Sequence, residues 1–193
     1  MPENSFLSEE ELHLIPFNSI GTNVKISRKA SIYSPDMISL GNNVRIDDFC
    51  ILSGEIKIGS FVHISAYSAL YGKFGIHLED YVTISGRVII YSQNDDYSGK
   101  FMTNPTLPKK FTNVTGGMVT CEKFAIIGAG SIVLPHVIIG EGAAVGSMSL
   151  VNKNIPPWKI YIGIPANYFK ERERNIILLE NELKNLLKNL NFF

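Results

Sequence analysis

Two adjacent carboxylates, Asp95 and Asp96, follow Ser92, Gln93 and Asn94 in an irregular stretch of the chain. A carboxylate in such a place can accept a proton or hold a cation. Asn and Asp also cap backbone amides where loops begin, so the same residues fit a purely structural role. Both interpretations stay open. No histidine occurs between residues 92 and 118, so these carboxylates are the stretch's first candidates for proton transfer.

The elements that must position these residues follow from a period of six. Aliphatic side chains recur six residues apart at Leu40, Ile46, Leu52, Ile58, Ile64 and Leu70, and the series resumes later in the chain. An amphipathic helix has a period of 3.6 residues and a half-buried strand a period of two, so neither explains this pattern. Three short strands in each coil of a triangular prism would point every sixth side chain inward. Glycine often follows the inward residue, as at Gly41 and Gly59, where a tight corner is expected.

Departures from the six-residue step all occur at one corner of this prism. They run from Ile32 to Leu40, from Leu70 to Leu78 and from Ile90 to Cys121. The last is by far the longest, and an irregular loop of such length is typical of a functional segment. We therefore predict an extended loop at 92–118.

The two ends of the prism need covers, since each inner coil is covered only by its neighbours. Ser8 and Glu11 form a capping-box pattern that predicts a short helix from Ser8 to Ile15. The stretch from Tyr168 to Leu190 lacks Gly and Pro and predicts a long helix. Its apolar positions alternate steps of three and four, as in a helix seam: Ile176, Leu179, Leu183, Leu186 and Leu190. We expect three segments: an N-terminal helical cap (1–17), a β-helix (18–157) and a C-terminal segment with a helix (158–193).

The composition places limits on partners and location. The formal net charge is +0, which gives no electrostatic reason to expect nucleic acid or a membrane surface. No apolar run approaches the roughly 18 residues of a membrane span, and the N-terminus lacks the pattern of a secretory signal. Cys50 and Cys121 fall three coils apart, about 14 Å at about 4.8 Å per coil, too far for a disulfide. We expect a cytoplasmic protein without membrane insertion.

The four histidines differ in their register on the prism. His13 falls on the N-terminal helix at the surface, and His77 precedes an inward leucine and should point outward. His63 precedes Ile64, and His136 falls at the corner from which the long loop departs. Zinc sites need several ligands converging on one open position, and the repeat offers no such cluster of histidines, so no metal is expected.

Several long motifs resemble one known family over nearly the whole chain. The repeats, the stretch IIGAGSIVLPHVIIGEGAAVGSMSLVNKNIPP (126–157) and the closing YIGIPANYFKER (161–172) are similar to the hexapeptide-repeat acetyltransferases. The segments VRIDDFCILSG (44–54), NDDYSG (94–99) and TNPTLP (103–108) resemble members of O-antigen pathways that N-acetylate dTDP-4-amino-4,6-dideoxyglucose. The resemblance implies an all-β, left-handed parallel β-helix, a homotrimer, and acetyl-coenzyme A bound between two prisms. It also implies that the extended loop helps to shape the acceptor pocket.

The resemblance also implies a set of cofactor-binding positions. Six residues match coenzyme-contacting positions of the galactoside acetyltransferase branch: Ala129, Ser147, Asn152, Lys153, Asn167 and Lys170. Ala129 and Ser147 are three steps of six apart and should stack one coil apart, beside a pantetheine arm parallel to the prism axis. Lys153 and Lys170 could then meet phosphate as point charges. Alternatively, the small residues of this set have only a structural role and allow the coils to stack.

The loop departs from that branch in the residue available for acid–base chemistry. Where the branch has a histidine as general base, this chain has the stretch from Ser92 to Asp96. This points to Asp95 or Asp96 as the catalytic carboxylate and to His63 as a catalytic alternative at the cleft between subunits. Asn94, Tyr97 and His136 are expected to bind the substrate. Asp47 and Asp48, on a corner of the second coil, are expected to be structural or to line the cleft.

The expected reaction is therefore acetyl transfer from acetyl-coenzyme A to the amine of a sugar nucleotide. The runner-up is O-acetylation of a sugar hydroxyl in the same cleft, because a hydroxyl would need the general base that the loop lacks. Two other classes of β-helix remain as alternatives: a zinc carbonic anhydrase and a non-enzymatic ice-binding or scaffold protein. Binding of coenzyme A separates the acyltransferase from both.

Overall fold

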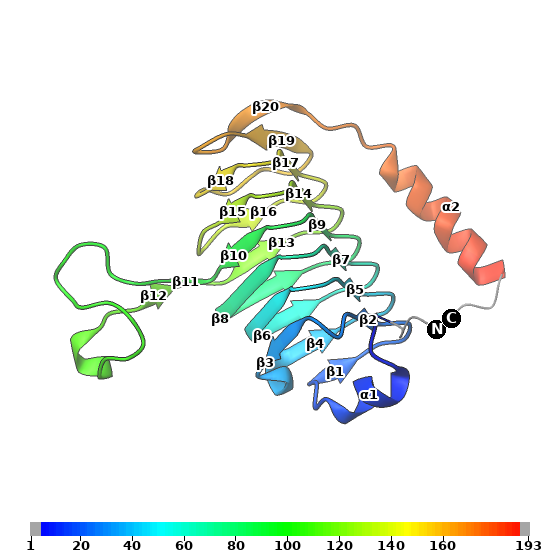
Figure 1. Ribbon diagram of the computed structural model, residues 1–193. Helices are drawn as coiled ribbons and strands as arrows, with labels where there is room; N and C mark the ends of the chain where they lie inside the picture. Colours follow the sequence, from blue (N-terminus) through cyan, green and yellow to red (C-terminus); the bar gives the residue numbers. More distant parts are fainter. Residues whose placement is uncertain (1–4, 190–193) are drawn as a thin grey trace.

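A three-sided column of short parallel strands forms the body of the protein in a computed structural model that describes residues 5–189 (Figure 1). A short helix lies at the N-terminal end, a loop projects from one side, and a longer helix lies on the opposite side. The architecture is a left-handed parallel β-helix, as predicted.

The strands fall into three faces of the prism. The first face has β1 (Ser19–Ile20), β4 (Ile38–Leu40), β13 (Val119–Cys121) and β16 (Ile138–Ile139). The second has β2 (Lys25–Ile26), β5 (Arg45–Ile46), β7 (His63–Ile64), β9 (Thr83–Ile84), β14 (Ile126–Ile127), β17 (Ala144–Val145) and β19 (Lys159–Ile162). The third has β3 (Ser31–Tyr33), β10 (Ile89–Tyr91), β15 (Ile132–Val133) and β18 (Leu150–Val151). Two longer strands, β6 (Ile51–Ile58) and β8 (Ala69–Leu78), turn from the third face into the first.

Inward side chains stack directly on those of the next coil. Leu52 pairs in register with Leu70, and both are fully buried. Ile90 pairs with Val133 across the long loop, so the insertion does not change the register of the coils. Each buried aliphatic side chain contributes about 2 kcal/mol to folding relative to exposure. The six-residue period therefore predicts correctly which side chains form the core.

The corner glycines have a different cause from the one expected. A Cβ on Gly41 would lie 2.6 Å from the carbonyl carbon of Gly59 one coil above, so close stacking of backbones requires glycine there. The left-handed backbone conformation of the corner falls two residues later, at Asn43 (φ 56°) and Phe61 (φ 59°). Glycine is thus selected by contact between coils rather than by a positive φ.

The N-terminal cap has the predicted capping box. Helix α1 (Glu9–Leu14) has Ser8 as its N-cap, the Ser8 side chain accepts from the Glu11 N–H, and Glu11 accepts from the Ser8 N–H. Arg28 also donates to Glu11 at 2.6 Å, and this contact, together with the Ser8 N–H, lowers the pKa of Glu11 to about 2. The ion pair thus joins the cap to the first coil.

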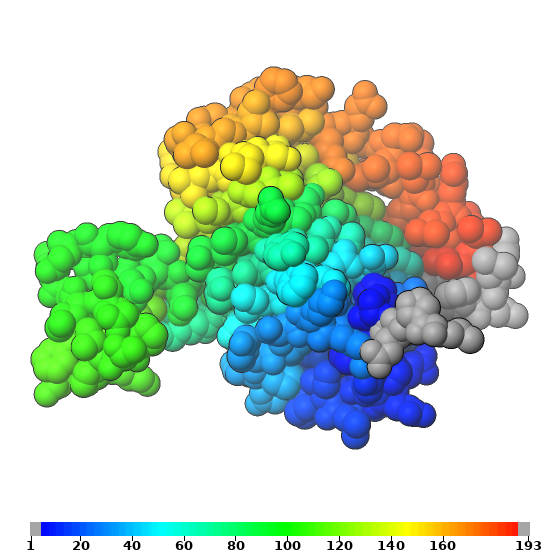
Figure 2. Space-filling model, in the orientation of Figure 1, coloured from blue at the N-terminus to red at the C-terminus, as the bar shows by residue number. Residues whose placement is uncertain are grey.

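All three departures from the repeat lie between the third and first faces, as predicted. The first contains the 3-10 helix η1 (Pro35–Met37), and the second is the bend of β8 at Gly72 to Gly75. The third is the loop arm, by which we mean residues 92–118. Its stem is an antiparallel pair, β11 (Gln93–Asn94) and β12 (Thr115–Gly116), and it contains the 3-10 helix η2 (Lys109–Phe111). The loop arm extends away from the prism (Figures 1 and 2).

The C-terminal helix prediction was wrong at its start. Residues Asn167–Glu171 form strand β20, antiparallel to β19, and helix α2 begins only at Ile176 (Ile176–Asn189). Strand β19 pairs with β17, so the second face continues past residue 157. Absence of Gly and Pro permits a helix without requiring one, and here unpaired groups of β19 are satisfied by β20. Leu190 lies outside the described residues.

The apolar seam predicted on this helix is only partly the packed side. Leu179 and Leu186 are 51% and 55% exposed, whereas Glu180 is buried and Leu183 is half-buried. The buried Glu180 accepts from Lys123 at 2.7 Å. Helix α2 therefore packs on its own prism through an ion pair as well as through apolar contacts. No helix within residues 5–189 is long and apolar enough to cross a bilayer.

Candidate functional site

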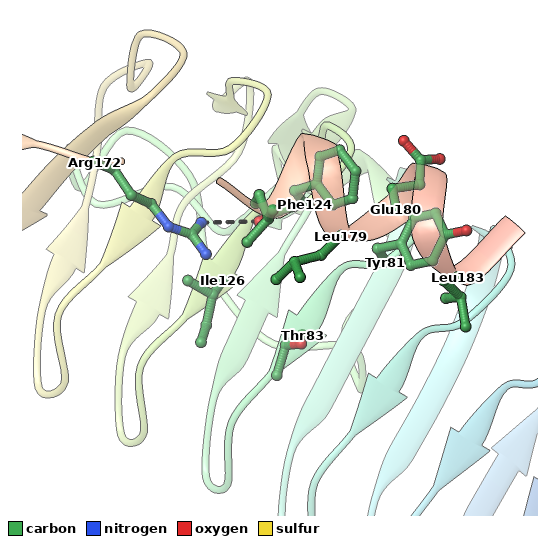
Figure 3. Close-up of a pocket in the computed structure, with 9 residues that line it drawn as sticks. Tyr81, Thr83, Phe124, Ile126, Arg172, Leu179, Glu180 and Leu183 are labelled. Carbon is green, nitrogen blue, oxygen red and sulfur yellow. Dashed lines mark hydrogen bonds between the residues drawn. The ribbon is translucent and has the colours of Figure 1, made fainter. Parts of the chain in front are cut away.

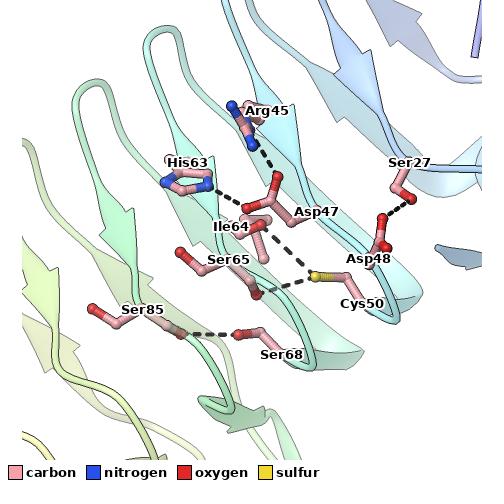
Figure 4. Close-up of polar contacts among 10 residues, drawn as sticks. All are labelled: Ser27, Arg45, Asp47, Asp48, Cys50, His63, Ile64, Ser65, Ser68 and Ser85. Carbon is pink, nitrogen blue, oxygen red and sulfur yellow. Dashed lines mark hydrogen bonds and ion pairs between the residues drawn. The ribbon is translucent and has the colours of Figure 1, made fainter. Parts of the chain in front are cut away.

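A polar cluster centred on Asp47 lies on the second face of the prism (Figure 4). His63 Nε2 is 2.8 Å from Asp47 Oδ2, and Arg45 Nε donates to Asp47 Oδ1 at 2.7 Å. Strand pairing explains the contact, because Arg45 of β5 and His63 of β7 are register partners. Asp47 follows β5 directly, so its side chain reaches both.

The electrostatics of this cluster keep Asp47 ionised. Partial burial acts to raise the pKa of Asp47, but the hydrogen bonds from Arg45 and His63 outweigh it, and the pKa is lowered overall. The side chain of His63 is 41% exposed and that of Asp47 only 18%. The imidazole is thus accessible from outside while its carboxylate partner lies behind it.

The polar residues next to this cluster stabilise the coils. Asp48 accepts from Lys29 at 2.9 Å and from the Ser27 hydroxyl, and Ser68 donates to the carbonyl of Ser85 at 2.9 Å. Cys50 donates to the carbonyl of Ser65 at 3.2 Å. Asp48 therefore has the structural role that was one of the two expected for it.

The two carboxylates of the loop arm differ in their surroundings. Asp96 accepts from the Ser98 N–H at 2.7 Å, from the Ser98 hydroxyl at 2.7 Å and from the Gly99 N–H at 3.1 Å. This is the turn chemistry of an aspartate that caps local backbone amides. Asp95 is exposed, and within the described part of the chain its side chain makes no hydrogen bond or ion pair. Asp95 is therefore the better candidate of the two for contact with a substrate.

The predicted catalytic residues do not come together within one chain. His63 lies on the second face, whereas the loop arm with Asp95 and Asp96 leaves from the corner between the third and first faces, opposite the second (Figure 1). In a three-sided prism, a corner and its opposite face are separated by the packed core. A site that combines His63 with Asp95 therefore requires two chains.

The predicted substrate-binding residues lie on or beside the loop arm. Asn94 is in its stem, where it pairs with Thr115, and Tyr97 is 91% exposed. His136 is exposed, and its ring occupies the space that a Cβ on Gly117 would need. The register argument that placed His136 at the base of the loop is thus confirmed.

The other two histidines lie away from these groups. His13 is exposed on α1, and its Nδ1 is 2.6 Å from the carbonyl of Glu9. His77 is half-buried on β8 beside Glu79 and Lys123. Among residues 5–189, no group of three or more His, Cys, Asp and Glu side chains is arranged to hold a metal ion.

The predicted cofactor positions occupy three places rather than one. Ala129 and Ser147 are exposed and lie one coil apart at the corner after the second face, where the Met148 N–H donates to the Ala129 carbonyl at 2.8 Å. Asn152 and Lys153 are exposed just after β18, at the corner from which the loop arm leaves. Asn167 and Lys170 lie on β20, beside the end of the second face. These sets would line one groove only if a second chain contributed part of it.

An apolar hollow of about 260 Å³ lies between α2 and the second face (Figure 3). Tyr81, Phe124, Arg172 and Leu179 are among the residues that line it. Arg172 Nη1 donates to the carbonyls of Phe124 and Gly142 at 2.9 and 3.0 Å, which holds the chain before α2 in place. None of the predicted site residues lines this hollow, and its two charged residues, Arg172 and Glu180, are engaged in attaching the helix to the prism.

The partnership of Asp47 with His63 was missed in the sequence. The available signal was the register: Arg45 and His63 occupy equivalent places in consecutive coils, one residue before the inward Ile46 and Ile64, and Asp47 is one residue after Ile46. Residues that flank an inward position in this way lie side by side on the outer surface.

Known acyltransferases are similar to this chain in sequence and in fold. No protein-family model matches the chain. A curated relative, the dTDP-4-amino-4,6-dideoxy-D-glucose acyltransferase of Escherichia coli, is 48% identical over 183 residues, which cover 93% of this chain and 95% of the relative.

The solved structures include AntD, an N-acyltransferase from Bacillus cereus. Its complex with dTDP and 3-hydroxybutyryl-CoA has a TM-score of 0.92 and 54% identity, with 97% of this chain and 99% of that chain covered. A serine-to-cysteine variant of AntD, in complex with dTDP-4-amino-4,6-dideoxyglucose and coenzyme A, has a TM-score of 0.92 and 53% identity over 95% and 98% of the two chains. On this similarity, the chain is an acyltransferase that belongs to the dTDP-4-amino-4,6-dideoxyglucose N-acyltransferases of the hexapeptide-repeat family.

Proposed function

We propose that the protein transfers the acetyl group of acetyl-coenzyme A to the 4-amino group of dTDP-4-amino-4,6-dideoxyglucose, for O-antigen or other surface lipopolysaccharide synthesis. The observation that carries the proposal is the match over almost the whole chain to AntD, whose complex holds this sugar nucleotide together with coenzyme A. Asp95 is exposed and has no side-chain partner among residues 5–189, which supports an amine acceptor, because a carboxylate can hold an ammonium group.

The chemistry suits the residues available. A sugar amine resembles an α-amino group with a pKa of about 8, so part of it is neutral and nucleophilic near pH 7. Its nitrogen attacks the thioester carbon, the new C–N bond forms, and the C–S bond breaks to release coenzyme A thiolate. Backbone N–H groups beside the groove would stabilise the oxyanion of the tetrahedral intermediate. Asp95 binds the acceptor nitrogen, and either Asp95 or His63 takes the proton that the nitrogen loses.

A homotrimer is part of the proposal. The loop arm and the second face lie on opposite sides of one prism, so only another copy can bring Asp95 to His63. Cyclic symmetry then repeats the same site at each boundary. The pantetheine arm would lie along Ala129 and Ser147 of one prism, while Lys153 near the loop corner comes from the next. A cytoplasmic location fits the two buried free thiols, Cys50 and Cys121, which suit a reducing compartment.

Competing acceptors and donors test the proposal. The purified protein is given dTDP-4-amino-4,6-dideoxyglucose or hydroxyl-only glycosides, each with acetyl-CoA or 3-hydroxybutyryl-CoA, and the acylated products are identified by mass spectrometry. We expect the amine with acetyl-CoA to react fastest. Faster acylation of the hydroxyl acceptors would establish the O-acetyltransferase instead, and a preference for 3-hydroxybutyryl-CoA would overturn the donor assignment.

A further inference from the structure

We propose that Asp47 is a positioning residue for acyl transfer: it holds the imidazole of His63 so that Nδ1 faces the groove and takes the proton from the acceptor amine. This inference rests on the proposed function and assigns the proton acceptor that the function left open. It makes Asp95 the group that binds the amine and His63 the group that deprotonates it.

The geometry of the cluster decides which ring nitrogen is free. Asp47 Oδ2 lies 2.8 Å from His63 Nε2, and an ionised carboxylate can only accept, so Nε2 carries the proton. Nδ1 then has the lone pair. Figure 4 shows the second ring nitrogen on the side of the ring away from Asp47, and no hydrogen bond of the described residues involves it.

Arg45 holds the carboxylate in turn. Its Nε donates to Asp47 Oδ1 at 2.7 Å, so both oxygens of Asp47 are engaged and the carboxylate cannot rotate freely. The pKa of Asp47 is lowered in spite of its partial burial, and the negative charge is therefore present at neutral pH. A fixed charge behind the ring stabilises the imidazolium that forms when Nδ1 is protonated.

The cluster also lies where a thioester is expected. Along the second face the strand order is β7, β9, β14 and β17, so His63 lies two coils from Ala129, about 10 Å at about 4.8 Å per coil. A pantetheine arm that runs past Ser147 and Ala129 parallel to the prism axis would continue toward the coil of β7. The exposed side chain of His63 faces outward there, where the proposed trimer would bring the neighbouring chain's loop arm.

The proton balance closes without another reactant. The amine nitrogen forms a bond to the thioester carbon and passes one proton to His63 Nδ1. The C–S bond breaks, and the imidazolium returns the proton to the thiolate, which leaves as coenzyme A thiol. Neutral His63 is restored with its proton still on Nε2 toward Asp47.

Steady-state kinetics of four variants test the assignment. We expect His63→Gln to lower kcat about 100-fold and Asp47→Asn about 10-fold, with both KM values nearly unchanged, because general-base catalysis contributes about this much. The double variant should have the kcat of His63→Gln alone, since Asp47 acts only through the imidazole. Asp48→Asn is the matched control: it removes the adjacent carboxylate, whose partners are Ser27 and Lys29, and should leave kcat within about twofold.

A second measurement determines directly which imidazole nitrogen of His63 carries the proton. With 15N-labelled histidine, His63 of the wild type should show a protonated Nε2 and an unprotonated Nδ1 in its neutral form, and Asp47→Asn should lose this single tautomer. Asp47→Glu, which keeps the charge, should recover part of both the signal and kcat. Addition of imidazole should restore turnover to His63→Ala but not to Asp47→Asn.

The outcomes separate this inference from the proposed function. If the wild type acetylates the amino sugar while His63→Gln and Asp47→Asn retain its kcat, the positioning role is refuted and the function stands. Multiplicative losses in the double variant, or an unprotonated Nε2, would also refute the role. If the wild type forms no product with the amino sugar, the function fails, and the tautomer measurement still tests the geometry.

Discussion

Lys123 Nζ lies 2.7 Å from Glu180 Oε1, and this contact joins helix α2 to a corner of the prism 57 residues earlier in the chain. Lys184, one turn further along the helix, also contacts Glu180 at 2.8 Å. Glu180 is almost fully buried, and removing its carboxylate from water costs free energy. The ammonium groups of Lys123 and Lys184 offset this cost. The helix is therefore attached by a specific ion pair and not by apolar packing alone.

Removing this carboxylate should loosen the helix and leave the prism intact. We expect Glu180→Ala to cost about 1 to 3 kcal/mol of unfolding free energy, because the half-buried Lys123 loses its charged partner. Urea denaturation followed by circular dichroism measures the loss. Glu182→Ala, which removes an exposed carboxylate of the same helix, is the control. Equal stability of the two variants would contradict the role of the pair.

The ionisation of Glu180 should also make the stability of the folded protein depend on pH. Burial acts to raise the pKa of Glu180, but the hydrogen bonds from Lys123 and Lys184 lower it overall, below its usual value of 4.5. A lowered pKa in the folded state stabilises the protein above pH 4.5, and this stability is lost as the pH falls below that value. Wild type should therefore lose more stability than Glu180→Gln on acidification from pH 5 to about pH 3. Parallel losses in both proteins would argue against this linkage.

Excision of residues 94–115 should abolish turnover without unfolding the β-helix. Gln93 and Gly116 are paired at the base of the loop arm, and Ile90 remains in register with Val133 across it, so the cut ends lie close together. Far-ultraviolet circular dichroism should retain the β-type spectrum while no acylated product forms. Loss of that spectrum would mean that the arm contributes to the fold itself.

The two loop carboxylates should respond differently to removal of their charge. Asp95→Asn should reduce turnover at neutral pH about 10-fold or more, with partial recovery as rising pH makes free amine abundant. Asp96→Asn keeps a side-chain oxygen that can still accept from Ser98 and Gly99, so its effect should be smaller. Rates measured from pH 6.5 to 9 compare them. A larger loss in Asp96→Asn would reverse the assignment of the two residues.

Mixed assemblies should reveal a site shared between chains. If Asp95 of one copy meets His63 of the next, a trimer of Asp95→Asn and His63→Gln subunits contains some intact sites. Co-refolding the two impaired variants should then give more activity than either variant has alone. Sedimentation should show a trimer as the active species. An active monomer, or no recovery on mixing, would contradict the proposed arrangement.

Much of the architecture was readable from the sequence because a solenoid is local and repetitive. Each inward residue, such as Leu52 or Ile64, meets the residue one coil away, so a fixed spacing of six reports the contact directly. The corner of the insertions and the capping box of Ser8 and Glu11 follow from equally short-range patterns. The start of the last helix does not, because Asn167–Glu171 become a strand only by pairing with β19, a contact that helix propensity does not describe.

The candidate site likewise has features that the sequence predicts and features that depend on long-range contacts. Residue type and register by themselves made His63, Asp95 and Asp96 candidates, because chemistry and spacing are properties of the chain. Ala129 and Ser147 became candidates through the resemblance to galactoside acetyltransferases, and register added only that they stack one coil apart. Only the tertiary structure decided that Asp96 is engaged in its own turn and that Asp47 holds His63. These are relations between side-chain directions, and a linear period of six determines which residues face outward but not what meets them there.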